Sequence, residues 1–102
     1  MFIISIHYTA PLEEMDKHIP DHVKFLDHYY EKLDHYYEKN IFMASGRKVP
    51  RTGGVILAVA ESIGEIKKII LDDPFHKLEM AEYTITEFTP SKFHPGLEGI
   101  LK

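Results

Sequence analysis

The order of its short apolar runs restricts the fold of this 102-residue chain more than any other feature. Four runs are rich in β-branched and aromatic side chains, which is typical of strands: residues 2–9, 41–48, 54–60 and 81–89. A helical pattern follows the first run, and a second one follows the third run. The length suits one domain and excludes two full ones, so the sequence predicts a single βαββαβ unit.

Local signals mark where the first helix begins and ends. Pro20 suits the first turn, where its missing N–H needs no partner, and Asn40 suits the left-handed position just past the end. We therefore expect a helix over residues 20–39. The stripe facing the sheet has the spacing of one helical face and consists of His22, Leu26, Tyr29, Leu33 and Tyr36.

The second helix begins at a capping box. Ser62 and Glu65 are spaced so that each side chain can satisfy a backbone donor near the other. Proline disfavours a helical residue before it, so Asp73-Pro74 ends this helix. The expected buried face contains four isoleucines: Ile63, Ile66, Ile69 and Ile70.

With right-handed crossovers, this order predicts an α+β fold of the ferredoxin-like type, a four-stranded antiparallel sheet with both helices on one face. The two faces of the strands at 2–9 and 54–60 are both substantially apolar. Helices on one side leave the other face uncovered, so the pattern predicts a homodimer that packs sheet against sheet. The tail at residues 91–102 contains Phe93, Leu97, Ile100 and Leu101, and we expect it to dock, with docking across the dimer as one option.

A tandem repeat lies inside the first predicted helix. Residues 26–32 (LDHYYEK) are followed at once by an identical copy at residues 33–39. Seven helical residues return within about 20° of the starting direction, so both copies keep one apolar stripe, but they lengthen the helix by ~10 Å. We expect one copy to pack on the sheet while the other overhangs, unwinds or displaces the segment before it. The alternative is a native long helix.

Several segments together resemble the YciI-related (YCII) family of proteins. The resemblance runs from Met1 to about Pro90 and is carried by the N-terminal strand and by five motifs: Pro20-Asp21-His22-Val23-Lys24-Phe25-Leu26, Ala44-Ser45-Gly46, Pro50-Arg51-Thr52-Gly53-Gly54, Asp73-Pro74-Phe75 and Glu87-Phe88-Thr89-Pro90. The resemblance implies a domain at residues 1–90 that forms a dimeric α/β barrel. In family members, arginine often stands at the position of Ile19 and proline at that of Arg47, so the substrate need not be inherited.

The resemblance also implies an active site, in which a histidine at the start of the first helix pairs with the aspartate of the Asp-Pro-Phe motif. By motif these residues are His22 and Asp73. A characterised member eliminates hydrogen chloride from a chlorinated hydroxyquinol, so lyase or isomerase chemistry on a small molecule is implied here. Asp73 would fix the tautomer of His22, whose other ring nitrogen would act as a base. Ser45 would bind a substrate oxygen, and Arg51 would attract a carboxylate or phenolate.

Each of these residues also has an ordinary structural explanation. Asp73 before Pro74 is a good N-cap for a helical turn at residues 74–79, a role that is compatible with catalysis. His22 would be a satisfied histidine at the edge of the core, Ser45 a structural residue, and Arg51 a solvated side chain at a hairpin tip.

Composition narrows the classes of function. The absence of cysteine removes disulfides, thiolate nucleophiles and Cys-type metal sites, and a net charge of −4 argues against binding nucleic acid. No run approaches the ~20 apolar residues that span a membrane, and no secretory signal is evident, so the expected location is the cytoplasm.

The sequence shows no cofactor motif and no metal site, so we expect neither a cofactor nor a metal. Gly53-Gly54 joins two strands and does not precede a helix, unlike a phosphate-binding loop. His28 and His35 lie ~10 Å apart on one helix face, too far to share a metal ion. His18 and His22 are spaced i, i+4, but Pro20 lies between them and no third ligand is evident.

Two other functions stay open. One is a noncatalytic dimeric protein that binds a ligand or assists another protein. The other is a variant in which the duplicated heptapeptide serves the study of folding and activity is incidental.

Overall fold

The computed structural model describes residues 1–31 and 41–97. Its elements are, in chain order, β1 (Phe2–Tyr8), α1 (Leu12–Glu31), β2 (Ile41–Arg47), β3 (Gly53–Val59), α2 (Ile63–Ile70), α3 (Pro74–Lys77), β4 (Ala81–Glu87) and the 3₁₀ turn η2 (Pro95–Leu97). In these residues no helix is both long enough and apolar enough to span a bilayer.

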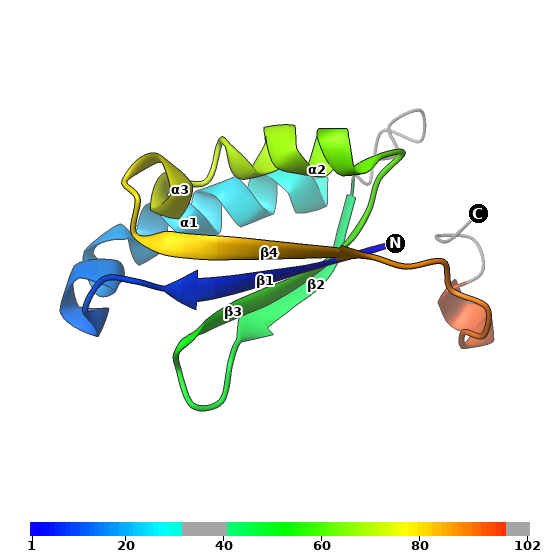
Figure 1. The fold of residues 1–102 in the computed structure, drawn as a ribbon, viewed down its shortest axis with the longest axis horizontal. Helices are drawn as coiled ribbons and strands as arrows, with labels where there is room; N and C mark the ends of the chain where they lie inside the picture. Colours follow the sequence, from blue (N-terminus) through cyan, green and yellow to red (C-terminus); the bar gives the residue numbers. More distant parts are fainter. Residues whose placement is uncertain (32–40, 98–102) are drawn as a thin grey trace.

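The strands form one antiparallel sheet in the order β2-β3-β1-β4. The helices lie together on one face of this sheet, and the described residues place no helix on the other face (Figure 1). The chain start is held at the end of β4, where the N–H of Phe88 donates to the carbonyl of Met1 over 2.9 Å. The arrangement confirms the predicted α+β fold of the ferredoxin-like type.

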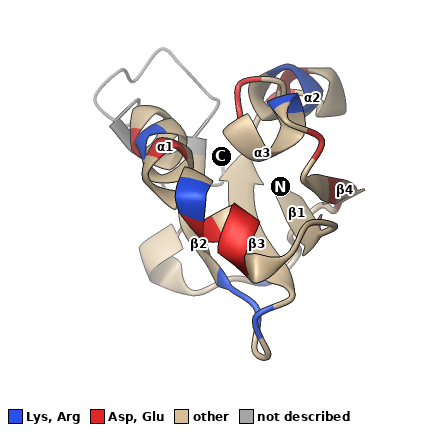
Figure 2. Cartoon of the chain, turned by 90° about the vertical axis from the view of Figure 1, so that its left-hand side faces the viewer, with Lys and Arg blue, Asp and Glu red and all other residues tan. Residues whose placement is uncertain are grey.

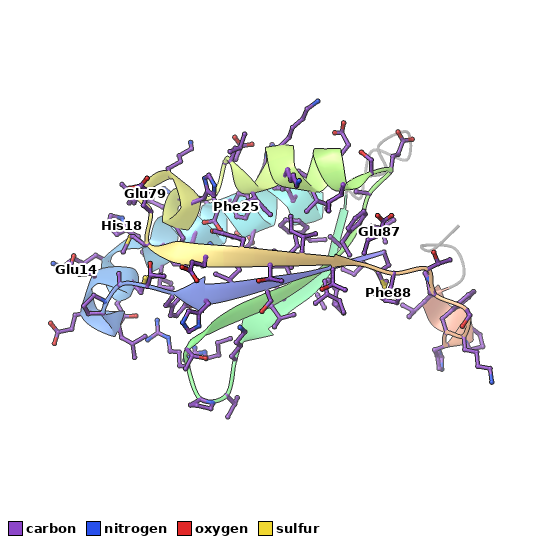
Figure 3. All side chains as sticks on the ribbon, viewed as in Figure 1. Glu14, His18, Phe25, Glu79, Glu87 and Phe88 are labelled. Carbon is purple, nitrogen blue, oxygen red and sulfur yellow. The ribbon has the colours of Figure 1, made fainter. Side chains whose placement is uncertain are left out.

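The core follows the alternation of the strands. In β1, Phe2, Ile4 and Ile6 are buried under the helices, whereas Ile3 and Ser5 on the opposite face are half-buried. Phe25, labelled in Figure 3, comes from α1 and packs in the same core cluster, although the predicted stripe did not include it.

The first heptapeptide copy packs on this core. Its Tyr29 is 6% exposed and belongs to the main cluster, and Leu26 packs against it. The phenol O–H of Tyr29 also donates to Asp72 Oδ2 over 2.7 Å. The second copy at residues 33–39, with Leu33 and Tyr36, lies outside the described residues.

The predicted start of the first helix was wrong. We expected it at Pro20, but α1 begins at Leu12 and Pro20 lies inside it. The carbonyl of Pro11 accepts hydrogen bonds from the N–H groups of Glu14 and Met15, and the acidic first turn favours the positive end of the helix dipole. Met15 is fully buried against the cluster of Phe75 and Met80, so tertiary packing outweighs the backbone hydrogen bond that an internal proline removes.

The other two helices begin as expected. The Ser62 side chain accepts the N–H of Glu65 at the start of α2, and Asp73 caps α3, which is shorter than the predicted turn at 74–79. Ile63, however, is 38% exposed, so the prediction that it belongs to the buried face was wrong. As the first residue of α2, it lies at the edge of the face that Ile66 and Ile70 bury.

The chain continues past β4 into η2, which extends beyond the sheet in Figure 1. Phe93 is 44% exposed, so its side chain is only partly covered by the rest of the chain. Ile100 and Leu101 lie outside the described residues. Docking of this tail across a dimer stays a prediction.

Candidate functional site

The two residues of the predicted dyad are hydrogen-bonded to each other. His22 lies within α1 and Asp73 at the N-cap of α3, and His22 Nδ1 is 2.9 Å from Asp73 Oδ1. The side chains are 13% and 1% exposed, respectively. An ionised carboxylate has no proton to donate, so His22 must carry its proton on Nδ1 to make this bond. Nε2 is then the basic nitrogen of the neutral ring.

Two further donors hold the Asp73 carboxylate. The N–H of Phe75 donates to Oδ1 over 3.1 Å, and the O–H of Tyr83 in β4 donates to Oδ2 over 2.6 Å. Burial, reinforced by the charge of Asp73, raises the pKa of Tyr83, so this phenol keeps its proton and stays a donor. Hydrogen bonds to the charged form are what a buried carboxylate needs to stay ionised.

Aromatic rings fix the orientation of His22. The Phe75 ring stacks on the imidazole with centroids 4.3 Å apart and an interplanar angle of 14°. Phe25 stacks less closely, with centroids 5.9 Å apart. Stacking and the Nδ1 hydrogen bond restrain the ring together, and His22 lines a cavity, so Nε2 is the nitrogen that a molecule in the cavity can reach.

This cavity has a volume of about 570 Å³ and lies between α1 and the strands β1, β2 and β3. Ser45 and Arg51, which the sequence analysis singled out, line it together with His22, whereas Asp73 lies behind His22 and does not line it. The remaining walls are largely apolar and include Ile6, Ile19, Val23, Leu26 and Ile56.

Small residues on the sheet leave room for this cavity. Ser45 and Gly54 pair in register with Ile56 and Ile6, whose side chains are buried beneath the helices, so larger side chains at these two positions would fill the space. Gly54 pairs with Ile6 in β1, and a Cβ added to it would lie 3.2 Å from the carbonyl oxygen of Gly46. The strands β2 and β3 therefore approach closely here, and their backbone forms part of the cavity wall.

Charged residues gather at one end of the cavity. Arg51 of the β2–β3 hairpin donates from its guanidinium to Asp16 of α1, which links the hairpin to the helix. This hydrogen bond holds the pKa of Asp16 below its ordinary value. Arg47 also lines this end, and Figure 2 shows the basic residues of the hairpin in blue.

The sequence analysis missed three residues that complete the site. Tyr83 lies on the face of β4 that packs against the helices, and its alternation with Ala81 and Ile85 could have indicated this. Phe75 could have been found as the residue two positions after an N-cap aspartate. No local signal indicates that Asp16 pairs with Arg51, because the two residues are 35 positions apart.

His18 and His22 were the candidate metal ligands of the first helix. Since α1 begins before Pro20, His18 and His22 do lie on one helix. No group of three or more His, Cys, Asp or Glu side chains among residues 1–31 and 41–97 is placed to hold a metal ion.

Fold and site together describe a ferredoxin-like α+β domain with a buried His–Asp pair beside a mostly apolar cavity. The model of the YCII-related domain matches residues 1–89, and the chain belongs to this family. A search of curated proteins found no match.

One solved structure with the same fold is 5-chloro-2-hydroxyhydroquinone dehydrochlorinase (TftG) from Burkholderia phenoliruptrix, in complex with 2,5-dihydroxybenzoquinone. The TM-score is 0.65 with 16% sequence identity, and the match covers 86% of this chain and 93% of that one. At this identity the likeness shows the fold alone.

Proposed function

We propose that this protein is a small-molecule enzyme of the lyase or isomerase type, in which His22 is the general base. The observation that carries the proposal is the 2.9 Å contact between His22 Nδ1 and the buried carboxylate of Asp73. Family membership and an enzyme of the same fold, a dehydrochlorinase, are consistent with it.

In the proposed reaction, Nε2 of His22 removes a proton from carbon or oxygen of a molecule in the cavity. The imidazolium that forms is stabilised by the charge of Asp73, which keeps Nδ1–H as its hydrogen-bond donor. The proton then returns to another position of the substrate, or leaves with a departing group. Ser45 and Arg51 contribute a hydroxyl group and a cation to the same cavity.

The dyad itself is tested by NMR of the imidazole nitrogens. In the wild type, ¹⁵N shifts of His22 should report a proton on Nδ1 and a free Nε2, and Asp73→Ala should remove this preference for one tautomer, because Nδ1 loses its acceptor. An unchanged tautomer would remove Asp73 as the partner of His22.

The chemistry is tested without knowing the substrate. Small molecules that raise the melting temperature are first selected, and each is then incubated with the protein in D₂O while ¹H NMR follows the exchange of its C–H protons. Replacing the base in His22→Gln should slow exchange about 10²- to 10⁴-fold. His18→Gln is the matched control, because His18 lies one turn earlier in α1 and does not line the cavity. Binding without any exchange would favour the noncatalytic ligand-binding protein.

We also propose that the protein is a homodimer. On the sheet face away from the helices, Ile3 and Leu57 are paired in register, and Val55 and Val59 continue the apolar surface along β3. Light scattering should give twice the chain mass, and Leu57→Glu should reduce it to that of a monomer. Val49→Glu, at a residue 95% exposed in the hairpin, should leave the dimer intact. A monomeric wild type would refute this proposal.

A further inference from the structure

The charges that line the cavity lie at one end of it. Arg47 and Arg51 come from the β2–β3 hairpin, and Asp16 comes from α1. The carboxylate of Asp73 does not line the cavity, and its charge is already engaged by His22 and Tyr83. The charged end therefore carries two cations and one carboxylate, which leaves one positive charge.

We propose that the cavity selects small molecules with a single negative charge, which Arg51 binds at this end while the apolar body of the molecule extends toward His22. The proposal rests on the proposed function, since it names the class of substrate for the same cavity. It assigns Arg51 as the residue that recognises charge and Asp16 as the residue that limits the accepted charge to one.

Arg51 is well placed for this role. Its side chain is 27% exposed, so it is partly shielded from water, and its partner Asp16 is more open at 58%. A guanidinium has five N–H donors in a planar fork, and the contact with Asp16 uses only one nitrogen, Nη2. Tyr8 interacts with the guanidinium as well, and the donors that remain can hold the oxygens of a carboxylate, which match this fork. Tyr8 lines the same cavity and adds a polar group near Arg51.

Asp16 gives the selection its upper limit. Its hydrogen bond with the guanidinium links Arg51 to α1 at the charged end of the cavity. Its own negative charge repels a second anionic group that binds beside Arg51, because like charges close together destabilise each other. A monoanion is therefore attracted to the charged end, whereas the second negative charge of a dianion is repelled by the carboxylate of Asp16.

The test uses three aromatic probes of similar shape. Benzoate has one charge, benzamide has none, and phthalate has two on neighbouring ring carbons, so both of its carboxylates would lie at the charged end. Dissociation constants come from ¹⁵N-NMR titration of the intact protein. The wild type should bind benzoate about tenfold or more tightly than benzamide, and Arg51→Gln should abolish this preference, because a charge-assisted contact is lost. Lys48→Gln is the matched control, since it removes a cation from the same hairpin outside the cavity. Equal binding of benzoate and benzamide, or an unchanged preference in Arg51→Gln, would overturn the proposal.

Asp16→Asn tests the limit on charge. Binding of phthalate should strengthen about two- to fivefold relative to benzoate, as expected for a partly exposed pair of charges. An unchanged ratio would refute the role of Asp16. His22→Gln separates this proposal from the proposed function: it should keep the preference for benzoate while losing C–H exchange. Intact exchange in the wild type with no preference for benzoate would overturn the charge selection alone.

Discussion

The hydrogen bond between Tyr83 and Asp73 should contribute to folding in a way that a double-mutant cycle can measure. Tyr83→Phe keeps the ring and removes only the O–H that lies 2.6 Å from Asp73 Oδ2. The carboxylate is 1% exposed, so bulk water does not reach it to replace the lost donor. Leaving one oxygen of a buried carboxylate unsatisfied should lower the free energy of unfolding by about 1–3 kcal/mol.

Asp73→Ala is the larger perturbation. It removes the N-cap of α3, which costs about 0.5–2 kcal/mol, and leaves the donors of His22 and Tyr83 without an acceptor. At about 1–3 kcal/mol for each of the two unsatisfied donors, the total loss should be about 2.5–8 kcal/mol. Whole domains of this kind have about 5–15 kcal/mol of stability, so a loss in the lower half of this range leaves the variant measurable.

The assay is urea unfolding followed by circular dichroism, at one protein concentration because an oligomer would make stability depend on it. The double variant Asp73→Ala/Tyr83→Phe lacks both the carboxylate and the phenol O–H, so this pair leaves no unsatisfied donor or acceptor. The two losses should therefore fall short of additivity by about 1–3 kcal/mol. Strict additivity, or a Tyr83→Phe variant within about 0.5 kcal/mol of the wild type, would refute the proposed coupling.

Three further predictions concern stability. Burial raises the pKa of Tyr83 and Tyr29 above the ordinary value of 10.0, and the neighbouring carboxylates of Asp73 and Asp72, respectively, raise it further. Near pH 10, therefore, only the unfolded chain loses these protons. The contribution of these phenols to the free energy of unfolding is therefore complete below pH 10 and is lost above it, by up to about 1.4 kcal/mol per pH unit for Tyr83. In Tyr83→Phe, the urea midpoint of unfolding should fall less steeply as the pH rises above 10. Ser62→Ala should lower the free energy of unfolding by about 1 kcal/mol through loss of the α2 cap, whereas Ser62→Gly should cost only a few tenths; equal losses would contradict the capping role. Deleting residues 33–39 should raise the melting temperature, because the first heptapeptide copy already packs on the core, and an unchanged or lower value would contradict this.

Much of the fold could be predicted because its signals are local. Alternation in β1 predicted which side chains are buried, the capping box located the start of α2, and Asp73-Pro74 located the start of α3. The start of α1 was missed because Pro20 carries the local signal of a first turn. Burial of Met15 against residues far along the chain decides that the helix begins eight residues earlier, at Leu12.

The sequence by itself determined the order of elements, the faces of the strands and the family of this protein, because each depends on residue types at short spacing. The tertiary structure alone decided the geometry of the candidate site. His22 meets Asp73 across 51 positions, and Arg51 meets Asp16 across 35. Hydrogen bonds depend on distance and angle in space, and those follow only when the helices pack on the sheet. The same packing leaves the cavity open beside the small residues of β2 and β3.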